Sequence, residues 1–177
     1  MQHAWDEIRG ALPSDEASSS FILLFVYPTV LYWIVGLLYL FVDLQRPKAI
    51  TQFKIQEKAN SNLSIRDAVS AARQILSNQL LIGFIYFCTF FHLRRAIGFD
   101  DGRELPSPSR VLLDFLVFLV MEELLFYYFH RLLHHPRVYK VVHKKHHEWT
   151  APIAITAMYC HPIEHMLSNL LPVAVGK

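Results

Sequence analysis

The sequence predicts an all-α membrane protein, a multi-pass helical bundle that carries a histidine-rich helical cap. Three observations lead to this prediction. The apolar residues are gathered into long blocks, where a soluble core would need them spread at amphipathic spacing. Charged residues make up only 18% of the 177-residue chain, below the roughly 25% typical of soluble domains. Eight of the ten histidines lie between His130 and His165, so this segment is the first place to look for a functional site.

The chain divides into three regions by composition. Residues 1–20 form a polar N-terminal segment, residues 21–129 hold the transmembrane helices and their connecting loops, and residues 130–177 form the histidine-box region. The first region carries Arg9 as its single fixed positive charge. Because a signal peptide begins with a basic segment, we expect the N-terminus to be retained.

Three apolar blocks are the candidate membrane spans. Phe21–Val42 is a 22-residue run without a charge, long enough to cross about 30 Å of hydrocarbon. Ile75–Phe91 is shorter and polar at its beginning, so it either crosses the membrane or dips in and returns. Val111–Phe129 is apolar except for three acidic residues. Acids at such depth are costly, so we expect them to serve a function.

The segments between these blocks set the predicted orientation. With three crossings, residues 43–74 and 130–150 share one side and together carry eleven Lys and Arg, against five on the other side. By the positive-inside rule the histidine-rich segment faces the cytoplasm. The sequon at Asn62 should then carry no glycan. From Arg66 onward, small and apolar residues recur on one helical face, which indicates a stretch that rests on a membrane surface.

Charge and cysteine content exclude other classes. The formal net charge is only +2 with histidine neutral, too small a bias to indicate nucleic-acid binding. Cys88 and Cys160 are two isolated cysteines, which form neither a disulfide framework nor a zinc ribbon.

The histidine spacing predicts a metal centre. His130 and His134 lie four residues apart on one helical face, and three imidazoles converge from a turn that begins at His143. His161 and His165 form another four-residue pair if Pro162 opens a helix. Imidazole suits iron, zinc, copper and nickel, and more ligands than one ion needs indicate two metals. The eight candidate ligands are His130, His134, His135, His143, His146, His147, His161 and His165.

Acidic residues near the histidines are candidates for a supporting role. Glu123 lies seven residues, or two helical turns, before His130, where its carboxylate can orient an imidazole, and Glu164 can do the same. Two other interpretations of the histidines remain open. One is a basic surface segment held against anionic lipid, and the other is bis-histidine haem ligation between membrane helices. His3 and His92 stand alone and are interpreted as structural or solvated.

The motifs that carry a family resemblance are paired histidine boxes after an acid-bearing apolar helix. They read, in order, HRLLHH from His130, HKKHH from His143 and YCHPIE from Tyr159. In this combination the chain resembles the fatty acid hydroxylase/sterol desaturase superfamily of membrane di-iron oxygenases, most closely its sterol C4-methyl oxidases. The resemblance extends from about Gln52 to the end of the chain.

This resemblance implies an endoplasmic-reticulum membrane enzyme with a cytoplasmic-facing site for two iron ions. Such enzymes use O2 and electrons from NAD(P)H, delivered by a reductase or cytochrome b5, to hydroxylate, oxidise or desaturate a sterol or acyl chain. At His165 the family does not reliably supply a ligand. The positions that the resemblance maps as iron ligands are His130, His134, His135, His143, His146, His147 and His161.

The sequence departs from this family at its end, where relatives continue with a membrane segment and a final HxxHH box. We therefore interpret residues 130–177 as an incomplete fatty acid hydroxylase domain and expect weak metal retention and little turnover. Two functions follow. The first is a di-iron lipid oxygenase of sterol or fatty acid metabolism, impaired by the missing box. The second is a catalytically inactive membrane protein that associates with full-length relatives.

Overall fold

The computed structural model describes residues 1–53, 63–98 and 104–175, and its regular structure within these ranges is helical, without a strand. Asn62 lies outside the described residues, so its predicted lack of a glycan stays a prediction. Five short elements, named η, are wound as π- or 3-10 helices. The elements in chain order are α1 (Gln2–Gly10), α2 (Glu16–Phe21), η1 (Ile22–Val26), α3 (Tyr27–Gln45), α4 (Lys48–Thr51), α5 (Ile65–Ser77), η2 (Asn78–Gly83), α6 (Phe84–Ala96), α7 (Pro108–Leu133), α8 (Pro136–Tyr139), η3 (His143–Glu148), η4 (Ala154–Met158), α9 (Pro162–Glu164), η5 (His165–Leu170) and α10 (Leu171–Val175).

Two continuous helices among the described residues are long and apolar enough to cross a membrane by length and composition. They are Glu16–Gln45, with 30 residues, and Ile65–Ala96, with 32 residues, and they contain the first two predicted spans. The second helix is longer than predicted because the amphipathic α5 continues into the apolar block. The third predicted span lies in α7, 26 residues long. Because α7 also carries charged residues, its crossing of the membrane stays a prediction. The cytoplasmic orientation of the histidine-rich cap also stays a prediction.

The ends of the long helices are fixed by local side chains. The Ser64 hydroxyl accepts a hydrogen bond from the backbone N–H of Asp67 at the start of α5, and the Ser107 hydroxyl caps α7 in the same way, each satisfying an N–H that the helix leaves unpaired. At the other end of α7, Pro136 prevents helix at His135, whose ψ is 133°. The predicted turn of the chain after His134 is therefore confirmed.

The buried core joins α5 to the segment that follows η3. Ala71 and Ile75 lie on the predicted apolar face of α5 and pack against Ile155 of η4. The hydroxyl of Tyr32 on α3 donates to the Ile155 carbonyl at 2.6 Å. At Gly36, also on α3, an added Cβ would lie 2.9 Å from Ile155 Cγ2. Glycine at this position therefore lets η4 approach α3 closely.

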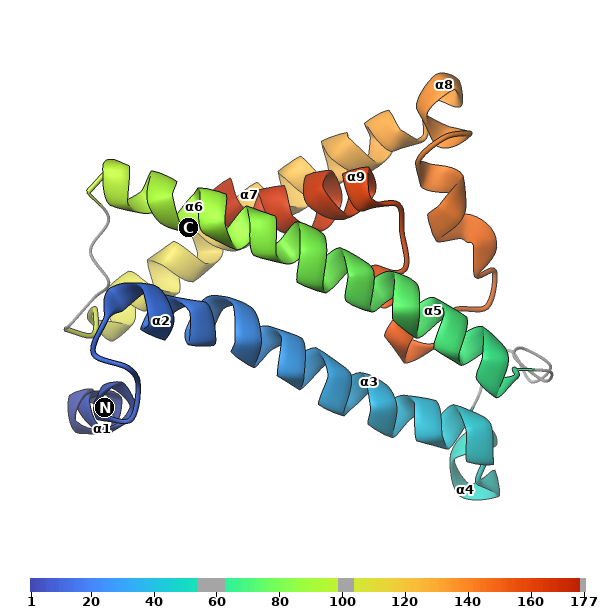
Figure 1. The fold of residues 1–177 in the computed structure, drawn as a ribbon, viewed down its shortest axis with the longest axis horizontal. Coiled ribbons are helices and arrows are strands. Elements are labelled where there is room, and N and C mark those ends of the chain that lie inside the picture. Colours follow the sequence, from blue (N-terminus) through green and yellow to red (C-terminus); the bar gives the residue numbers. More distant parts are fainter. Residues whose placement is uncertain (54–62, 99–103, 176–177) are drawn as a thin grey trace.

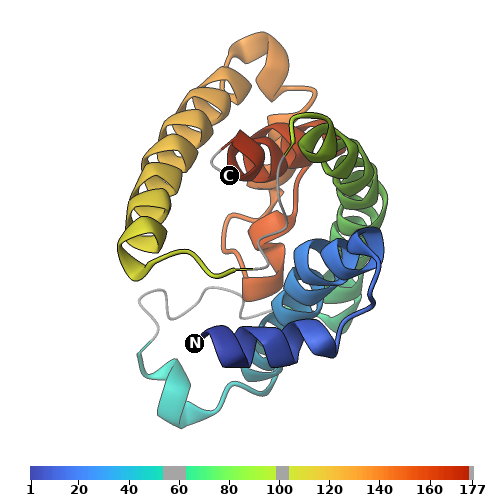
Figure 2. The same ribbon diagram turned by 90° about the vertical axis from the view of Figure 1, so that its left-hand side faces the viewer.

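The long helices form two sides of the molecule. In Figure 1, α7 runs behind α6, and the turned view of Figure 2 shows the α2–α3 and α5–α6 helices on one side and α7 on the other. Seen end-on, the C-terminal elements α9, η5 and α10 lie between α7 and α6 (Figure 2). At its C-terminal end α7 leads into α8 and then η3 (Figure 1). This arrangement brings the histidines at the end of α7 and on η3 together with Glu164 of α9.

Candidate metal centre

Five histidines gather where the end of α7 meets η3. His130 and His134, one turn apart on α7, have Nε2 atoms 3.1 Å apart. The Nε2 atom of His143, on η3, lies 3.1 Å from that of His134 and 3.0 Å from that of His147. The His146 ring stacks on the His143 ring, with centroids 5.5 Å apart. Ligand atoms of His130, His134 and His143 all lie within 4.8 Å of one another.

The local sequence explains this convergence. A spacing of four on α7 puts His130 and His134 on one face, and the turn at Pro136 sends the chain back toward that face. The segment from His143 is wound as a 3-10 helix, in which residues three apart eclipse each other. His143 and His146 have this spacing, and their ring planes differ by only 23°.

The central imidazole is oriented by a buried carboxylate. His143 Nδ1 lies 2.7 Å from Glu164 Oε1, and the two residues are 0% and 4% exposed. Burial and the surrounding imidazoles lower the pKa of His143, so the ring is neutral near pH 7. With Nδ1–H donated to the carboxylate, the Nε2 lone pair faces His134 and His147. Burial also raises the pKa of Glu164 to about 7, and its Oε2 is buried without a hydrogen-bond partner among the described residues.

A backbone carbonyl orients the stacked ring. His146 Nδ1 lies 3.2 Å from the Tyr159 carbonyl oxygen. Because a carbonyl can only accept, Nδ1 carries the proton and Nε2 keeps its lone pair. The Tyr159 hydroxyl in turn donates to Glu148 at 2.7 Å, and burial raises the pKa of this phenol to about 12.

A side-chain network, which the sequence analysis missed, ties two histidine-bearing segments to α5 and η2. Lys145 Nζ donates to Gln74 Oε1 at 2.7 Å, and Gln74 Nε2 donates to Asn78 Oδ1 at 3.2 Å. Asn78 Nδ2 donates to the Cys160 carbonyl at 2.9 Å. The sequence held one signal of this network, because Gln74 and Asn78 are amide residues four positions apart at the start of an otherwise apolar block. Burial raises the pKa of the Cys160 thiol to about 12, so this thiol is not ionised at neutral pH.

The remaining predicted site residues lie outside this cluster of five. His135 is exposed and caps α8, where its Nδ1 accepts from Arg137 N–H. His161 caps α9 through Nδ1. His165 is buried, and its Nδ1 accepts from the amide of Asn169 at 3.1 Å; burial lowers its pKa to about 4. Glu123 is exposed on α7. The structure thus brings one of the two predicted supporting carboxylates, that of Glu164, to an imidazole.

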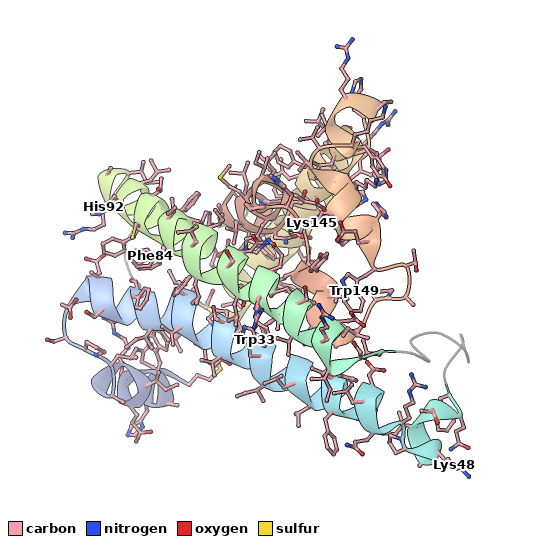
Figure 3. All side chains as sticks on the ribbon, turned by 45° about the vertical axis from the view of Figure 1, so that its right-hand side comes forward. Trp33, Lys48, Phe84, His92, Lys145 and Trp149 are labelled. Atoms are coloured by element: carbon pink, nitrogen blue, oxygen red, sulfur yellow. The ribbon has the colours of Figure 1, made fainter. Side chains whose placement is uncertain are left out.

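The isolated histidines lie apart, as expected. His3 and His92 are both exposed, and Figure 3 shows His92 at the far end of α6, away from Lys145 beside the cluster.

The donor set fits a transition metal. Two nitrogens bound at right angles to one ion, each about 2.1 Å from it, lie about 3.0 Å apart, and the Nε2 separations here are 3.0–3.1 Å. Neutral imidazoles with a carboxylate behind one of them are the ligands that iron, zinc, copper and nickel accept. The buried, unpaired oxygen of Glu164 adds a further acceptor beside the cluster.

An apolar cavity of about 440 Å³ lies beside the metal-centre segments, bounded by η1, η2, α6 and η5. Met158 and His165 bring the C-terminal region to its wall. The residues that line it are Leu23, Leu24, Phe25, Tyr27, Pro28, Thr29, Gln79, Gly83, Tyr86, Phe87, Phe90, Phe91, Arg94, Met158, His165, Asn169, Leu170 and Val173.

Comparisons with known proteins identify relatives of the chain. A family model described as fatty acid hydroxylase matches residues 115–176. The chain is 39% identical over 176 residues to fatty acid hydroxylase domain-containing protein 2 of Homo sapiens, covering 99% of this chain and 53% of that protein. It is 32% identical over 146 residues to methylsterol monooxygenase 1 of Rattus norvegicus, covering 81% and 48%. C-4 methylsterol oxidase of Candida albicans is 32% identical over 125 residues, covering 70% and 40%.

The matched segment begins inside α7 and includes all five clustered histidines. The chain spans about half the length of the curated relatives that it matches most fully. No solved structure matches it. Together with the two long apolar helices, the sterol oxidase homologues support a membrane protein. Residues 115–176 therefore match the fatty acid hydroxylase domain model, in a chain homologous to fatty acid hydroxylase domain-containing protein 2 and to methylsterol monooxygenases.

Proposed function

We propose that the chain belongs to a membrane-bound, iron-dependent enzyme that oxidises a sterol or fatty acyl lipid with O2. The observation that carries this proposal is the meeting of Nε2 atoms 3.0–3.1 Å apart around His143, whose other ring nitrogen is engaged by buried Glu164. Such an arrangement leaves several lone pairs directed at one place, which suits a metal better than a hydrogen-bond network.

The five clustered histidines are the residues that would hold iron. His135 and His161, which flank the cluster along the chain, are proposed as additional ligands on the strength of the histidine boxes. We do not assign His165 to this set, because the family that the histidine boxes resemble does not reliably supply a ligand at this position. Two iron ions bound here would supply the O2 chemistry, and the protein supplies orientation and electrostatics.

The chain's own residues prepare this site in two ways. Glu164 holds the His143 ring, and the Tyr159 carbonyl holds the His146 ring, so that both keep the tautomer with a free Nε2. The apolar cavity, whose wall includes Met158 and His165 of the neighbouring C-terminal segment, offers a place for the hydrocarbon part of a lipid.

The setting of the reaction follows from the substrate. A sterol or acyl lipid resides in the bilayer, so we place the enzyme in the endoplasmic-reticulum membrane with the histidine region toward the cytoplasm. There NAD(P)H supplies electrons through a reductase or a carrier such as cytochrome b5. The excess of Lys and Arg in the segments on the histidine side supports this orientation.

The test is product formation by the purified chain. The detergent-purified protein, loaded with iron, is incubated with O2, NADPH, a reductase and cytochrome b5, and with either a 4-methylsterol or palmitoyl lipid. Mass spectrometry then detects oxygenated product. We expect product from one substrate class, and His146→Ala should reduce its yield at least tenfold.

The matched control is His92→Ala, which removes an exposed imidazole far from the cluster and should leave the yield unchanged. Equal yields from His146→Ala and the native chain would contradict the proposed ligands. Absence of product from a folded, iron-loaded chain with both substrates would contradict the enzymatic proposal itself.

A further inference from the structure

The N-terminal helix α1 has one apolar face and one polar face. Ala4, Trp5 and Ile8 lie on one side of this helix, because positions three and four apart share a face. Ile8 is 52% exposed, Ala4 is exposed as well, and no residue of α1 is buried. The part of the chain that the structure describes therefore leaves the apolar face of α1 largely uncovered.

The polar face of α1 carries no net charge. Gln2 Nε2 donates to Asp6 Oδ1 at 2.8 Å, and His3 Nδ1 lies 3.5 Å from Glu7 Oε1, so both pairs join residues one helical turn apart. The amino terminus and Arg9 balance the charges of Asp6 and Glu7 when histidine is neutral. This helix therefore has no excess positive charge with which to attract anionic lipid.

The position of α1 is crosswise to the first candidate membrane span. It is seen end-on in Figure 1, where α3 runs along the view, and lengthwise in Figure 2. Residues 11–15 connect it to α2, a link that reaches about 20 Å at most. Gln2 Oε1 also accepts from the Leu105 N–H at 2.8 Å, just before α7 begins at Pro108. With α3 crossing a bilayer, α1 lies in the plane of that bilayer, at the end of α7 opposite to the histidine centre.

The exterior of the neighbouring helix indicates what covers the apolar face of α1. Leu24, Tyr27 and Val30, which follow α2, are exposed. They belong to the same large apolar exterior as the rest of α3, and hydrocarbon is the surrounding that suits such an exterior. Because α1 lies beside the start of this helix, it lies at the level where hydrocarbon meets headgroups. Tryptophan is enriched at that level, and Trp5 is on the apolar face of α1.

From this geometry we propose that α1 is an interfacial helix, whose apolar face of Ala4, Trp5 and Ile8 lies in the boundary between headgroups and acyl chains. Such helices bury their apolar face about 5–10 Å deep. The partner is a zwitterionic phospholipid surface, because the polar face is neutral. Since Gln2 binds the segment before α7, α1 also fixes the level in the membrane at which α7 begins. This role is separate from the proposed oxidation, and its test needs neither iron nor turnover.

The test measures which solvent each face of α1 meets in the full chain. The chain carries Cys88→Ala and one nitroxide label, at Ile8→Cys on the apolar face or at Gly10→Cys on the opposite face; buried Cys160 stays unlabelled. It is reconstituted in phosphatidylcholine vesicles. Paramagnetic resonance compares relaxation of the label by O2, which concentrates in hydrocarbon, and by a water-soluble nickel complex. We expect the label at position 8 to lose relaxation by nickel and gain relaxation by O2, and the label at position 10 to show the reverse.

Gly10→Cys is the matched control, because it lies about 200° around the helix axis from Ile8 and an added Cβ there meets nothing within 4 Å. If Ile8→Cys disturbs the helix, Ala4→Cys repeats the measurement on the same face. Equal access of nickel to both faces overturns the proposal. Shielding of position 8 from both reagents also overturns it, because that face would then lie against protein. Burial that appears only after phosphatidylserine is added contradicts the zwitterionic partner.

Discussion

The histidine centre and the long helices have opposite patterns of burial. His143 and Glu164 are ionisable, yet they are 0% and 4% exposed. Leu38 and Phe41 on α3 are apolar, yet they are 65% and 63% exposed. In a soluble domain the leucine would be inside and the carboxylate outside.

This difference shows that the two regions are stabilised by different partners. The histidine centre satisfies its polar groups internally, through carboxylate, carbonyl and imidazole contacts. The apolar exterior is too large to face water without association, and hydrocarbon is the surrounding that suits it.

The largest effect is expected on the apolar exterior. Leu38→Asp places a carboxylate within the first candidate span, four residues before its end at Val42, at a cost of up to about 3 kcal/mol for membrane insertion. The fraction of chains that resists alkaline extraction from microsomes should therefore fall strongly. Leu38→Ile is the control and should integrate like the native chain. Undiminished integration of the Asp variant would mean that this face does not lie in the membrane.

The next effect concerns the two carboxylates that the sequence predicted to support imidazoles. Glu164→Gln should weaken iron binding about 10–100-fold, because it removes the charged acceptor of the His143 Nδ1–H. Glu123→Gln, on the exposed face of α7, should change it less than twofold. Iron retained against a competing chelator measures both. Equal losses would show that the contact between His143 and Glu164 has no special role.

A smaller effect is expected from the amide network. Asn78→Leu removes the 2.9 Å hydrogen bond to the Cys160 carbonyl and leaves only the longer one from Gln74 Nε2 at 3.5 Å, a loss of about 1 kcal/mol. We expect a lower thermal midpoint of the helical circular dichroism signal in detergent, with faster hydrogen exchange in residues 153–161. Ser77→Ala alters the exposed neighbouring residue and should have no such effect. If hydrogen exchange in residues 153–161 is unchanged in Asn78→Leu, the amide network does not hold this segment in place.

The smallest effect is expected at the contact between α3 and η4. Gly36→Ala brings a Cβ to 2.9 Å from Ile155 Cγ2 and should lower stability by about 1 kcal/mol, since the overpacking exceeds the gain in helix propensity. At Gly10 an added Cβ meets nothing within 4 Å, so Gly10→Ala should not destabilise. Denaturant titration in detergent compares the two variants. A stabilising Gly36→Ala would show that η4 can shift away from α3.

Sequence reasoning succeeded where the pattern is local. The apolar face of α5, the two long apolar helices and the turn at Pro136 follow from periodicity and backbone chemistry within a few residues. It failed where residues distant in sequence meet. Lys145 and Gln74 are 71 residues apart, and Asn78 and Cys160 are 82 apart, and no local pattern encodes such pairs.

The sequence by itself determined that the chain is helical, apolar in long blocks and equipped with imidazoles at the spacing of ligands, because helix periodicity and side-chain chemistry are properties of short segments. Only the tertiary structure decided which imidazoles meet, that Glu164 rather than Glu123 stands behind one of them, and that His165 lines the apolar cavity. These outcomes depend on how α7, η3 and η5 pack against one another, and packing is settled by contacts between distant segments.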